Sequence, residues 1–181
     1  MVSYSEMALP DLLDAFASNE PVPGGGSASA LAGSLGVSLL VMVAGLPATR
    51  TGSPEEAADL SEASARLRPL REALTRLIDE DGAAMPRAAE LALETMRHCQ
   101  QALRGSIVIA RSGHRRAATD TTTGVELLRA ALRSAGMNVD VNLSRLSDAE
   151  MAARFRAERN ELLEEGETDA RRAIEAALEP A

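Results

Sequence analysis

The stretch that decides the fold is Pro21-Val22-Pro23-Gly24-Gly25-Gly26-Ser27, together with the uncharged run that continues from residue 28 to residue 46. Two prolines stiffen the approach, and three consecutive glycines permit backbone conformations that other residues avoid. The pattern predicts a tight loop that leads into a buried helix. The first N–H groups of a helix have no intrahelical acceptor, so those beside bare glycines can face a ligand. A packing turn is the simpler alternative for the same pattern.

Small side chains line two faces of this expected helix. Ala28, Ala32 and Gly36 recur every four residues, and the same spacing relates residues 30, 34 and 38. Stripes of small residues let a second helix approach closely. The run therefore predicts a helix at the centre of a bundle, or one packed against its copy in a second subunit.

The uncharged run is also long enough to cross a bilayer. It is rich in Gly and Ser, however, no aromatic belt flanks it, and no second span follows in the sequence. A central helix in a bundle fits these features better than a membrane span.

The composition favours one all-α domain over residues 1–181. The chain is 45% hydrophobic and 25% charged, which is ordinary for a globular protein, and only 2% of it is aromatic. A core of Ala, Leu, Val and Met suits close helix packing better than a sheet. We expect a helical bundle with a long buried small-residue helix, dimeric as a whole.

Charge and cysteine usage exclude several classes of function. The formal net charge is −8, and all 19 basic residues are Arg. The absence of Lys excludes a lysine Schiff base and a P-loop lysine, and the acidity argues against a nucleic-acid surface. The single cysteine, Cys99, and the two histidines, His98 and His114, have no metal-ligand spacing, so no metal is expected. No basic segment followed by an apolar core opens the sequence, which predicts a cytoplasmic protein.

Capping signals and apolar spacing predict the remaining helices. Ser53 before Pro54 and Ser147-Asp148-Ala149-Glu150 are typical of helix starts. The strand-prone run at 106–110 has no partner strand and is assigned to a helix. The expected helices cover 9–16, 54–78, 86–110 and 124–137, and a last helix runs from the capping box at 147–150 to about residue 178.

Acidic residues provide the candidate catalytic groups. Asp79, Glu80 and Asp81 crowd the end of a predicted helix, where negative charge is unfavourable. A solvated acidic helix end is the simplest interpretation, but an acid in a cleft beside another acid would have a raised pKa and serve as general acid or base. Asp120, before three threonines, is most simply a helix N-cap.

Two asparagines and a basic loop complete the candidate set. Asn138 and Asn142 are four residues apart, so both project from one face if the helix continues through them. An amide offers a donor and an acceptor, which suits the edge of a heterocycle, although the two side chains can also satisfy each other. The run Gly113-His114-Arg115-Arg116 is the densest positive cluster of the chain.

Taken together, these motifs resemble the cyclodeaminase and methenyltetrahydrofolate cyclohydrolase family, which includes the C-terminal domain of formiminotransferase-cyclodeaminase. The glycine motif is specific and the later ones are supportive. The residues that carry the resemblance are Pro21, Pro23 to Ser27, Ala30-Leu31-Ala32-Gly33, Met42-Val43-Ala44, Ile78-Asp79-x-Asp81, Asp120 and Asn138-Val139-x-Val141-Asn142.

The resemblance implies an all-helical homodimer that binds a tetrahydrofolate derivative as substrate, near the glycine loop and the subunit interface. The implied reaction is hydrolysis of 5,10-methenyltetrahydrofolate to 10-formyltetrahydrofolate, or cyclodeamination of 5-formiminotetrahydrofolate. Either needs a proton carrier at the one-carbon bridge, and a carboxylate would stabilise the cationic methenyl form.

The resemblance also implies roles for individual residues. Asp81 is the first candidate for catalysis and Asp120 the second. Asn138 and Asn142 would orient the pterin. The glutamate tail would meet Arg115 and Arg116, and the loop residues Pro23, Gly24, Gly25, Gly26 and Ser27 would bind the substrate.

One segment departs from the family pattern. Members usually continue after the acid at Asp81 through a longer stretch with an aromatic residue and a lysine, whereas here Gly82-Ala83-Ala84-Met85-Pro86 follows. A role of that lysine is therefore lost or filled by an arginine such as Arg87. The alternative function is a catalytically inactive member that acts as a helical dimer or a ligand-binding protein.

Overall fold

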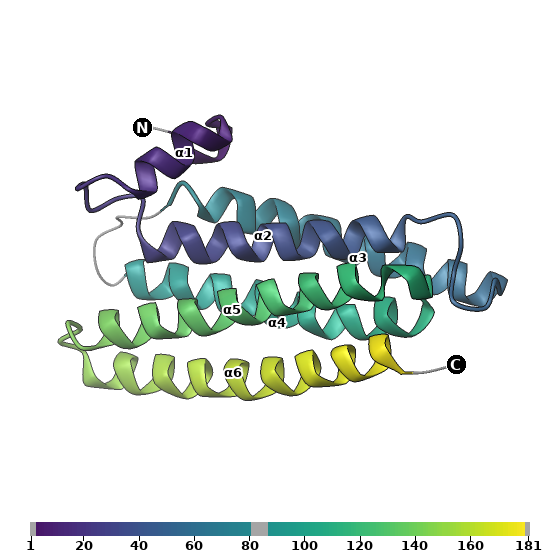
Figure 1. Cartoon of the computed structure of the whole chain (residues 1–181). Coiled ribbons are helices and arrows are strands. Elements are labelled where there is room, and N and C mark those ends of the chain that lie inside the picture. Colours follow the sequence, from purple (N-terminus) through teal and green to yellow (C-terminus); the bar gives the residue numbers. More distant parts are fainter. Residues whose placement is uncertain (1–2, 81–86, 180–181) are drawn as a thin grey trace.

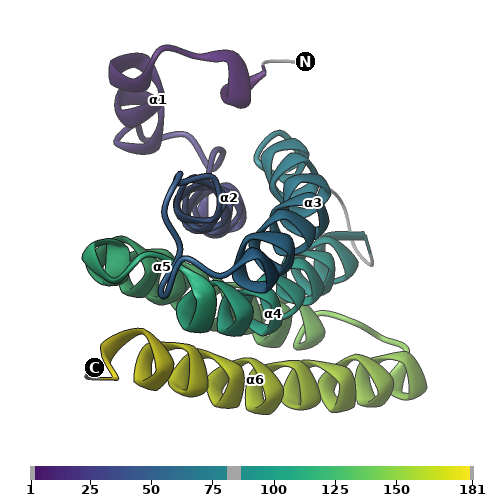
Figure 2. The same ribbon diagram turned by 90° about the vertical axis from the view of Figure 1, so that its right-hand side faces the viewer.

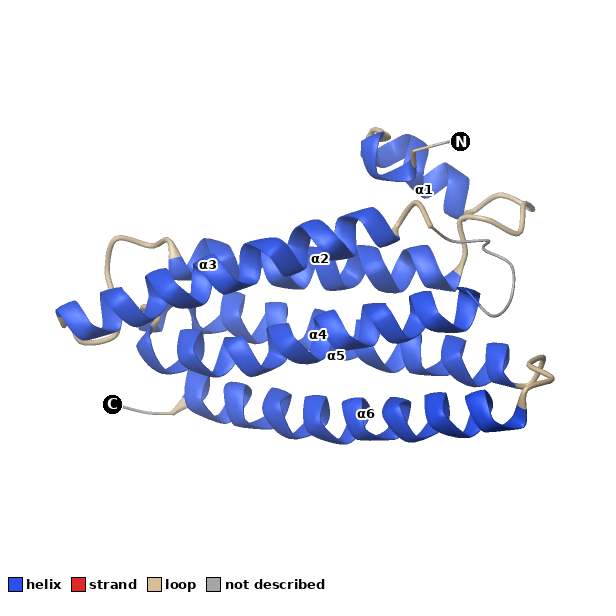
Figure 3. Ribbon diagram, turned by 180° about the vertical axis from the view of Figure 1, so that it is seen from behind, coloured by secondary structure: helices blue, strands red, loops and turns tan. Residues whose placement is uncertain are grey.

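The computed structural model describes residues 3–80 and 87–179, and these form helices joined by short loops (Figures 1 and 3). The helices are η1 (Tyr4–Glu6), α1 (Leu9–Phe16), α2 (Gly25–Ala44), α3 (Pro54–Leu77), α4 (Arg87–Ser112), η2 (Arg115–Ala117), α5 (Ala118–Leu143) and α6 (Ala149–Leu178). Within the two described ranges the extended pairing is limited to an isolated bridge between Thr49 and Gly113. The expected all-α class is confirmed.

The long helices are stacked in layers (Figure 2). Helices α2 and α3 form one layer, α4 and α5 the next, and α6 covers the outer side of α4 and α5. The short helix α1 lies on the opposite side, beyond α2 (Figure 2). Helix α2 contacts α3, α4 and α5 and is largely buried, as its composition predicts, whereas α4 contacts all four of the other long helices.

Helix α2 is long and apolar enough to cross a membrane. More than half of its most apolar stretch is buried inside the bundle, however, and the core helix of a soluble protein can have the same length and composition. One such helix is weak evidence for a membrane.

Two glycines set the distance between α2 and α5. A Cβ added at Gly36 would lie 2.7 Å from the carbonyl oxygen of Gly124, and one added at Gly124 would lie 3.0 Å from the carbonyl oxygen of Gly36. Such distances leave no room for a methyl group. The close approach predicted from the small-residue stripes is therefore confirmed, with α5 as the partner helix.

Helix starts agree only in part with the prediction. The Ser53 hydroxyl accepts a hydrogen bond from the N–H of Glu56 and caps α3. Helix α6 is capped by Asp148, which accepts from the N–H of Met151. Helix α5 begins at Ala118, six residues before the expected start, so Asp120 lies in its first turn. The N-cap role for Asp120 was therefore wrong.

The outer helix α6 is attached by packing and by ion pairs. A Cβ at Gly166 would lie 2.3 Å from Cδ2 of Leu132, so this glycine allows α6 to lie directly on α5. Arg97 donates to Glu158 at 2.6 Å. At the far end, Arg50 donates to the carbonyl oxygens of Ala110, Ala176 and Glu179, which joins the last turns of α4 and α6.

Candidate functional site

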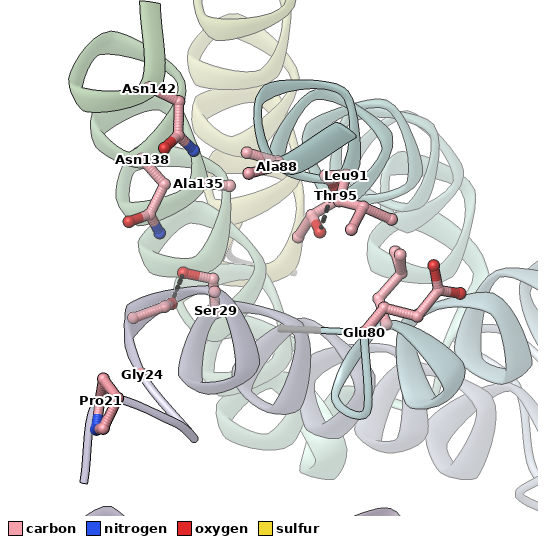
Figure 4. A pocket seen from close by; sticks show the side chains of 14 residues that line it. Pro21, Gly24, Ser29, Glu80, Ala88, Leu91, Thr95, Ala135, Asn138 and Asn142 are labelled. Carbon is pink, nitrogen blue, oxygen red and sulfur yellow. Dashed lines mark hydrogen bonds between the residues drawn. The ribbon is translucent and has the colours of Figure 1, made fainter. Parts of the chain in front are cut away.

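A cavity of about 240 Å³ opens at the end of the bundle where α2 and α4 begin and where α3 and α5 end (Figures 1 and 4). Four helix ends therefore contribute to one site. The described lining residues are Pro21, Gly24, Gly25, Gly26, Ser29, Leu77, Glu80, Ala88, Leu91, Ala92, Thr95, Ala135, Asn138 and Asn142.

The glycine loop forms one wall of this cavity. Gly24 is the N-cap of α2, and Gly25 and Gly26 form the beginning of its first turn. The N–H groups of Gly25 and Gly26 are at the start of the helix, where N–H groups have no intrahelical acceptor, and the positive end of the helix dipole lies at this point. The wall can therefore donate hydrogen bonds to a carbonyl or anionic oxygen.

The two asparagines lie where the sequence places them. Asn138 and Asn142 are one turn apart near the end of α5, and both line the cavity. A Cβ added at Gly25 would lie 3.4 Å from both Nδ2 and Oδ1 of Asn138. The amide of Asn138 therefore stands directly against the glycine loop (Figure 4).

Two of the predicted binding residues have a different place. Ser27 is 0% exposed, and its hydroxyl donates to the carbonyl oxygen of Ile78 at 2.7 Å. Pro23 is buried as well, and neither residue lines the cavity. The Ser27 side chain joins the start of α2 to the end of α3, and substrate binding by Pro23 and Ser27 stays a prediction.

In the acidic turn after α3, the side chains of Asp79 and Glu80 point in different directions. Asp79 turns to the N-terminal segment, where it accepts hydrogen bonds from the Ser5 hydroxyl at 2.6 Å, the Ser5 N–H at 3.0 Å and the Ser3 hydroxyl at 3.3 Å. Glu80 lines the cavity, and its Oε2 lies 3.0 Å from NH2 of Arg87. Asp81, the first catalytic candidate, lies outside the described residues.

Asp120, Arg115 and Arg116 lie at the opposite end of the bundle. They belong to η2 and to the first turn of α5, whereas Asn138 is near the end of the same helix. At 1.5 Å per residue, Asp120 and Asn138 are about 27 Å apart along the helix axis. A role for these three residues in this cavity within one chain is therefore excluded by the length of α5.

Hydroxyl groups of α2 and α4 complete the cavity, and the sequence analysis missed them. Ser29 donates to the carbonyl oxygen of Gly25 at 2.6 Å and lies 2.8 Å from Oγ of Ser134. Thr95 donates to the carbonyl oxygen of Leu91. Ser29 lies one helical turn after Gly25 and therefore on the same face of α2, so its place in the cavity could have been predicted from this spacing. Nothing in the sequence pairs Thr95 with the glycine loop.

The other reactive side chains lie elsewhere. The thiol of Cys99 is fully buried against α2, and this burial raises its pKa to about 12. Burial also lowers the pKa of His98, against the effect of Glu94, whose carboxylate lies 3.9 Å from Nε2. Among the described residues, no group of three His, Cys, Asp or Glu side chains is arranged to hold a metal ion.

The formiminotransferase-cyclodeaminase family model matches this chain over residues 8–85 and 82–161. The two matches together span the glycine loop, the acidic turn and both asparagines. The chain belongs to the formiminotransferase-cyclodeaminase family. The family matches meet at 82–85, in the same segment where the sequence departs from the family pattern.

Two known proteins are similar to this family member. A methenyltetrahydrofolate cyclohydrolase from Methylorubrum extorquens is 30% identical over 168 residues, which cover 77% of this chain and 81% of the relative. The crystal structure of a formiminotetrahydrofolate cyclodeaminase from Thermotoga maritima superposes with a TM-score of 0.65 at 22% identity. This match covers 95% of this chain and 94% of the other, and it shows a shared fold.

Proposed function

We propose that this chain is a folate-dependent one-carbon enzyme, whose substrate is 5,10-methenyltetrahydrofolate and whose product is 10-formyltetrahydrofolate. The observation that carries the proposal is the cavity in which the family's glycine loop meets the amides of Asn138 and Asn142. The Methylorubrum relative bears the name of this activity. Cyclodeamination of 5-formiminotetrahydrofolate, the activity named for the Thermotoga protein, is the second candidate.

The polar and apolar groups that line the cavity fit the pterin ring of such a substrate. A pterin presents neighbouring N–H donors and a carbonyl acceptor on one edge. The Asn138 and Asn142 amides offer both functions, and the N–H groups of Gly25 and Gly26 can bind the carbonyl oxygen. The apolar side chains of Leu77, Leu91 and Ala92 offer a surface for the ring faces.

Catalysis requires a carboxylate near the one-carbon bridge. It stabilises the methenyl cation and accepts a proton as water adds to the one-carbon bridge, which gives a neutral carbinolamine. Return of this proton to N5, cleavage of the bond between the bridge carbon and N5, and loss of the hydroxyl proton to solvent leave the formyl group on N10. Asp81 is the proposed catalytic base because it belongs to the acidic motif of the family, and the described part of that motif reaches the cavity at Glu80. The proposed reaction uses no metal. We also propose that residues 1–181 form a single domain and that the protein is cytoplasmic.

The test is the loss of 5,10-methenyltetrahydrofolate absorbance with added protein. We expect acceleration over buffer by the wild type, and loss of most of it in Asp81→Asn. The control is Asp59→Asn, an exposed acid on α3 that does not line this cavity. Folate binding without acceleration favours the alternative, an inactive member that binds ligands. Absence of both binding and acceleration overturns the folate proposal.

We also propose that the chain acts as a homodimer through α2 and α5. Ala28, Leu35 and Met42 are exposed at seven-residue spacing on α2, with Leu35 51% exposed. Met137, 60% exposed, and Val141 lie on the neighbouring α5. An uncharged helix with an apolar exposed stripe matches a second copy of itself across a two-fold axis. Leu35→Glu is expected to give a monomer in sedimentation.

Such a dimer would bring Asp120 of the second copy near the cavity of the first. Helices α2 and α5 are antiparallel, with Gly25 beside Asn138 and Gly36 beside Gly124. A two-fold axis perpendicular to them exchanges the two ends of the bundle, so Asp120 and Arg115 of the second copy come near this chain's cavity.

Subunit complementation tests this shared site. At substrate concentrations well below KM, Asp120→Asn and Asn138→Ala dimers are each expected to be weakly active. Random exchange of their subunits should restore about a quarter of the wild-type activity, because half of the dimers are hybrids and one of their two sites is intact. A site within one chain gives no recovery.

A further inference from the structure

Among the described residues that line the cavity, Glu80 is the one with a charged side chain. The other polar lining groups are neutral amides, hydroxyls and backbone N–H groups. A carboxylate among neutral described lining groups favours a cationic ring over a neutral ring of the same shape. The charge of Glu80 is therefore able to select among folates.

The chain just before Glu80 is held in place. The carbonyl oxygen of Ile78, two residues earlier, accepts from Ser27 of α2, and the carboxylate of Asp79 accepts from Ser3 and Ser5. These contacts commit Asp79 to the N-terminal segment. In Figure 4, Glu80 lies across the cavity from Asn138 and Asn142.

Arg87, in the first turn of α4, holds the Glu80 side chain. Its NH2 lies 3.0 Å from Glu80 Oε2, and its NH1 lies 3.7 Å from Glu90 and 4.0 Å from Glu94. One arginine thus faces three carboxylates, and it lies nearest to that of Glu80. The side chain of Glu80 remains 44% exposed and accessible to a ligand.

We infer that Glu80 is a specificity-determining residue, which selects the cationic methenyl form of the substrate over neutral folates, and that Arg87 positions it. This inference rests on the proposed function. Hydrolysis converts the methenyl cation into a neutral formyl group, so the attraction to Glu80 is lost in the product. Product release is favoured for the same reason.

The test compares a cationic and a neutral folate with the same pterin and glutamate tail. The KM for 5,10-methenyltetrahydrofolate and the inhibition constant of 5-formyltetrahydrofolate are measured for the wild type, Glu80→Gln and Glu90→Gln. We expect Glu80→Gln to raise the KM about fivefold with the inhibition constant unchanged, since a partly exposed charge pair contributes about 1 kcal/mol. Glu90→Gln removes a charge beside the same Arg87 but outside the cavity, and should change neither constant.

Other outcomes overturn the inference. An unchanged ratio of the two constants in Glu80→Gln, in an active enzyme, removes the role of Glu80 and leaves the proposed function standing. The same holds if the preference for the cation is lost only in Asp81→Asn. A wild type that neither hydrolyses the methenyl form nor binds 5-formyltetrahydrofolate in calorimetry overturns both proposals.

Discussion

At the scale of single residues, the amide of Asn138 tests the proposed pterin contact. Asn138→Ala removes the amide that stands against Gly25, with up to two hydrogen bonds to the ligand. We expect a KM about tenfold higher with kcat changed less, because each net hydrogen bond contributes about 1 kcal/mol. Asn160→Ala, at an exposed position on α6, is the control. Equal KM values in the two variants would contradict the contact.

A second residue, Arg50, contributes to the stability of the fold and not to the candidate site. Its guanidinium donates to three carbonyl oxygens at the ends of α4 and α6, where helices leave their acceptors unpaired. Arg50→Ala is expected to lower the free energy of unfolding by about 1–3 kcal/mol, measured by urea denaturation. Arg66→Ala loses only an exposed pair with Glu62 and should cost less than about 1 kcal/mol.

The residues of the site were predictable to different degrees, for physical reasons. Asn138 and Asn142 were found because a four-residue spacing places two side chains on one face of any helix. Ser27 was assigned to the ligand, but a hydroxyl in a first turn can bond a neighbouring helix end equally well, and here it bonds Ile78. Asp120 was grouped with Asn138 on the family resemblance, although the helix expected over 124–137 already separates the two residues within one chain.

At the scale of helices, the crossing of α2 and α5 depends on the absence of two side chains. Gly36→Ala places a methyl group 2.7 Å from the carbonyl oxygen of Gly124, so the helices must move apart. We expect a loss of about 1–3 kcal/mol in the free energy of unfolding. Gly45→Ala is the matched control, since its Cβ would meet carbonyl oxygens at 3.5 Å, an ordinary contact. An equal loss in both variants would contradict the crossing.

The N-terminal segment is attached to the bundle through Asp79, and this attachment should depend on pH. Burial raises the pKa of Asp79, but hydrogen bonds from Ser5, from the Tyr4 backbone and from Ser3 outweigh it, so the pKa is lowered overall. A lowered pKa means that the stabilisation is present above the ordinary value of about 3.9 and is lost as the pH falls below it.

Tyrosine fluorescence anisotropy measures this attachment, because Tyr4 is the single tyrosine and the chain has no tryptophan. We expect high anisotropy in the wild type above about pH 4 and a decrease in more acidic buffer. Asp79→Asn should have low anisotropy throughout, and Asp11→Asn, an exposed acid of α1, should behave like the wild type. An anisotropy that is independent of pH and of Asp79 would contradict the attachment.

Helix boundaries were predicted well where a cap or an apolar pattern marked them. Ser53 and the 147–150 motif located the starts of α3 and α6 within a few residues. The start of α5 was missed because Ala118 to Thr123 has weak helix propensity. There, η2 leads directly into the helix and the Nδ1 of His114 accepts from the N–H of Arg116, which replaces a conventional cap.

At the scale of the whole molecule, the thiol of Cys99 reports on the integrity of the bundle. It is buried where α4 meets α2, and a pKa of about 12 leaves almost no thiolate at pH 8. We expect no reaction with Ellman's reagent in native buffer, and rapid reaction of one thiol in denaturant. Fast labelling of the native protein would show that the bundle opens more readily than its packing implies.

The glycine crossing also has a mechanical consequence. Gly36 lies in the middle of α2 and Gly124 in the second turn of α5, and the glycine loop and Asn138 lie on the parts of the two helices that extend from this contact to the cavity. From Gly36 to Gly25 this part of α2 is about 16 Å long. A change in the angle between α2 and α5 at this contact therefore produces a larger displacement of the cavity walls. Core substitutions around Gly36 should then alter ligand selectivity, although they do not contact the ligand.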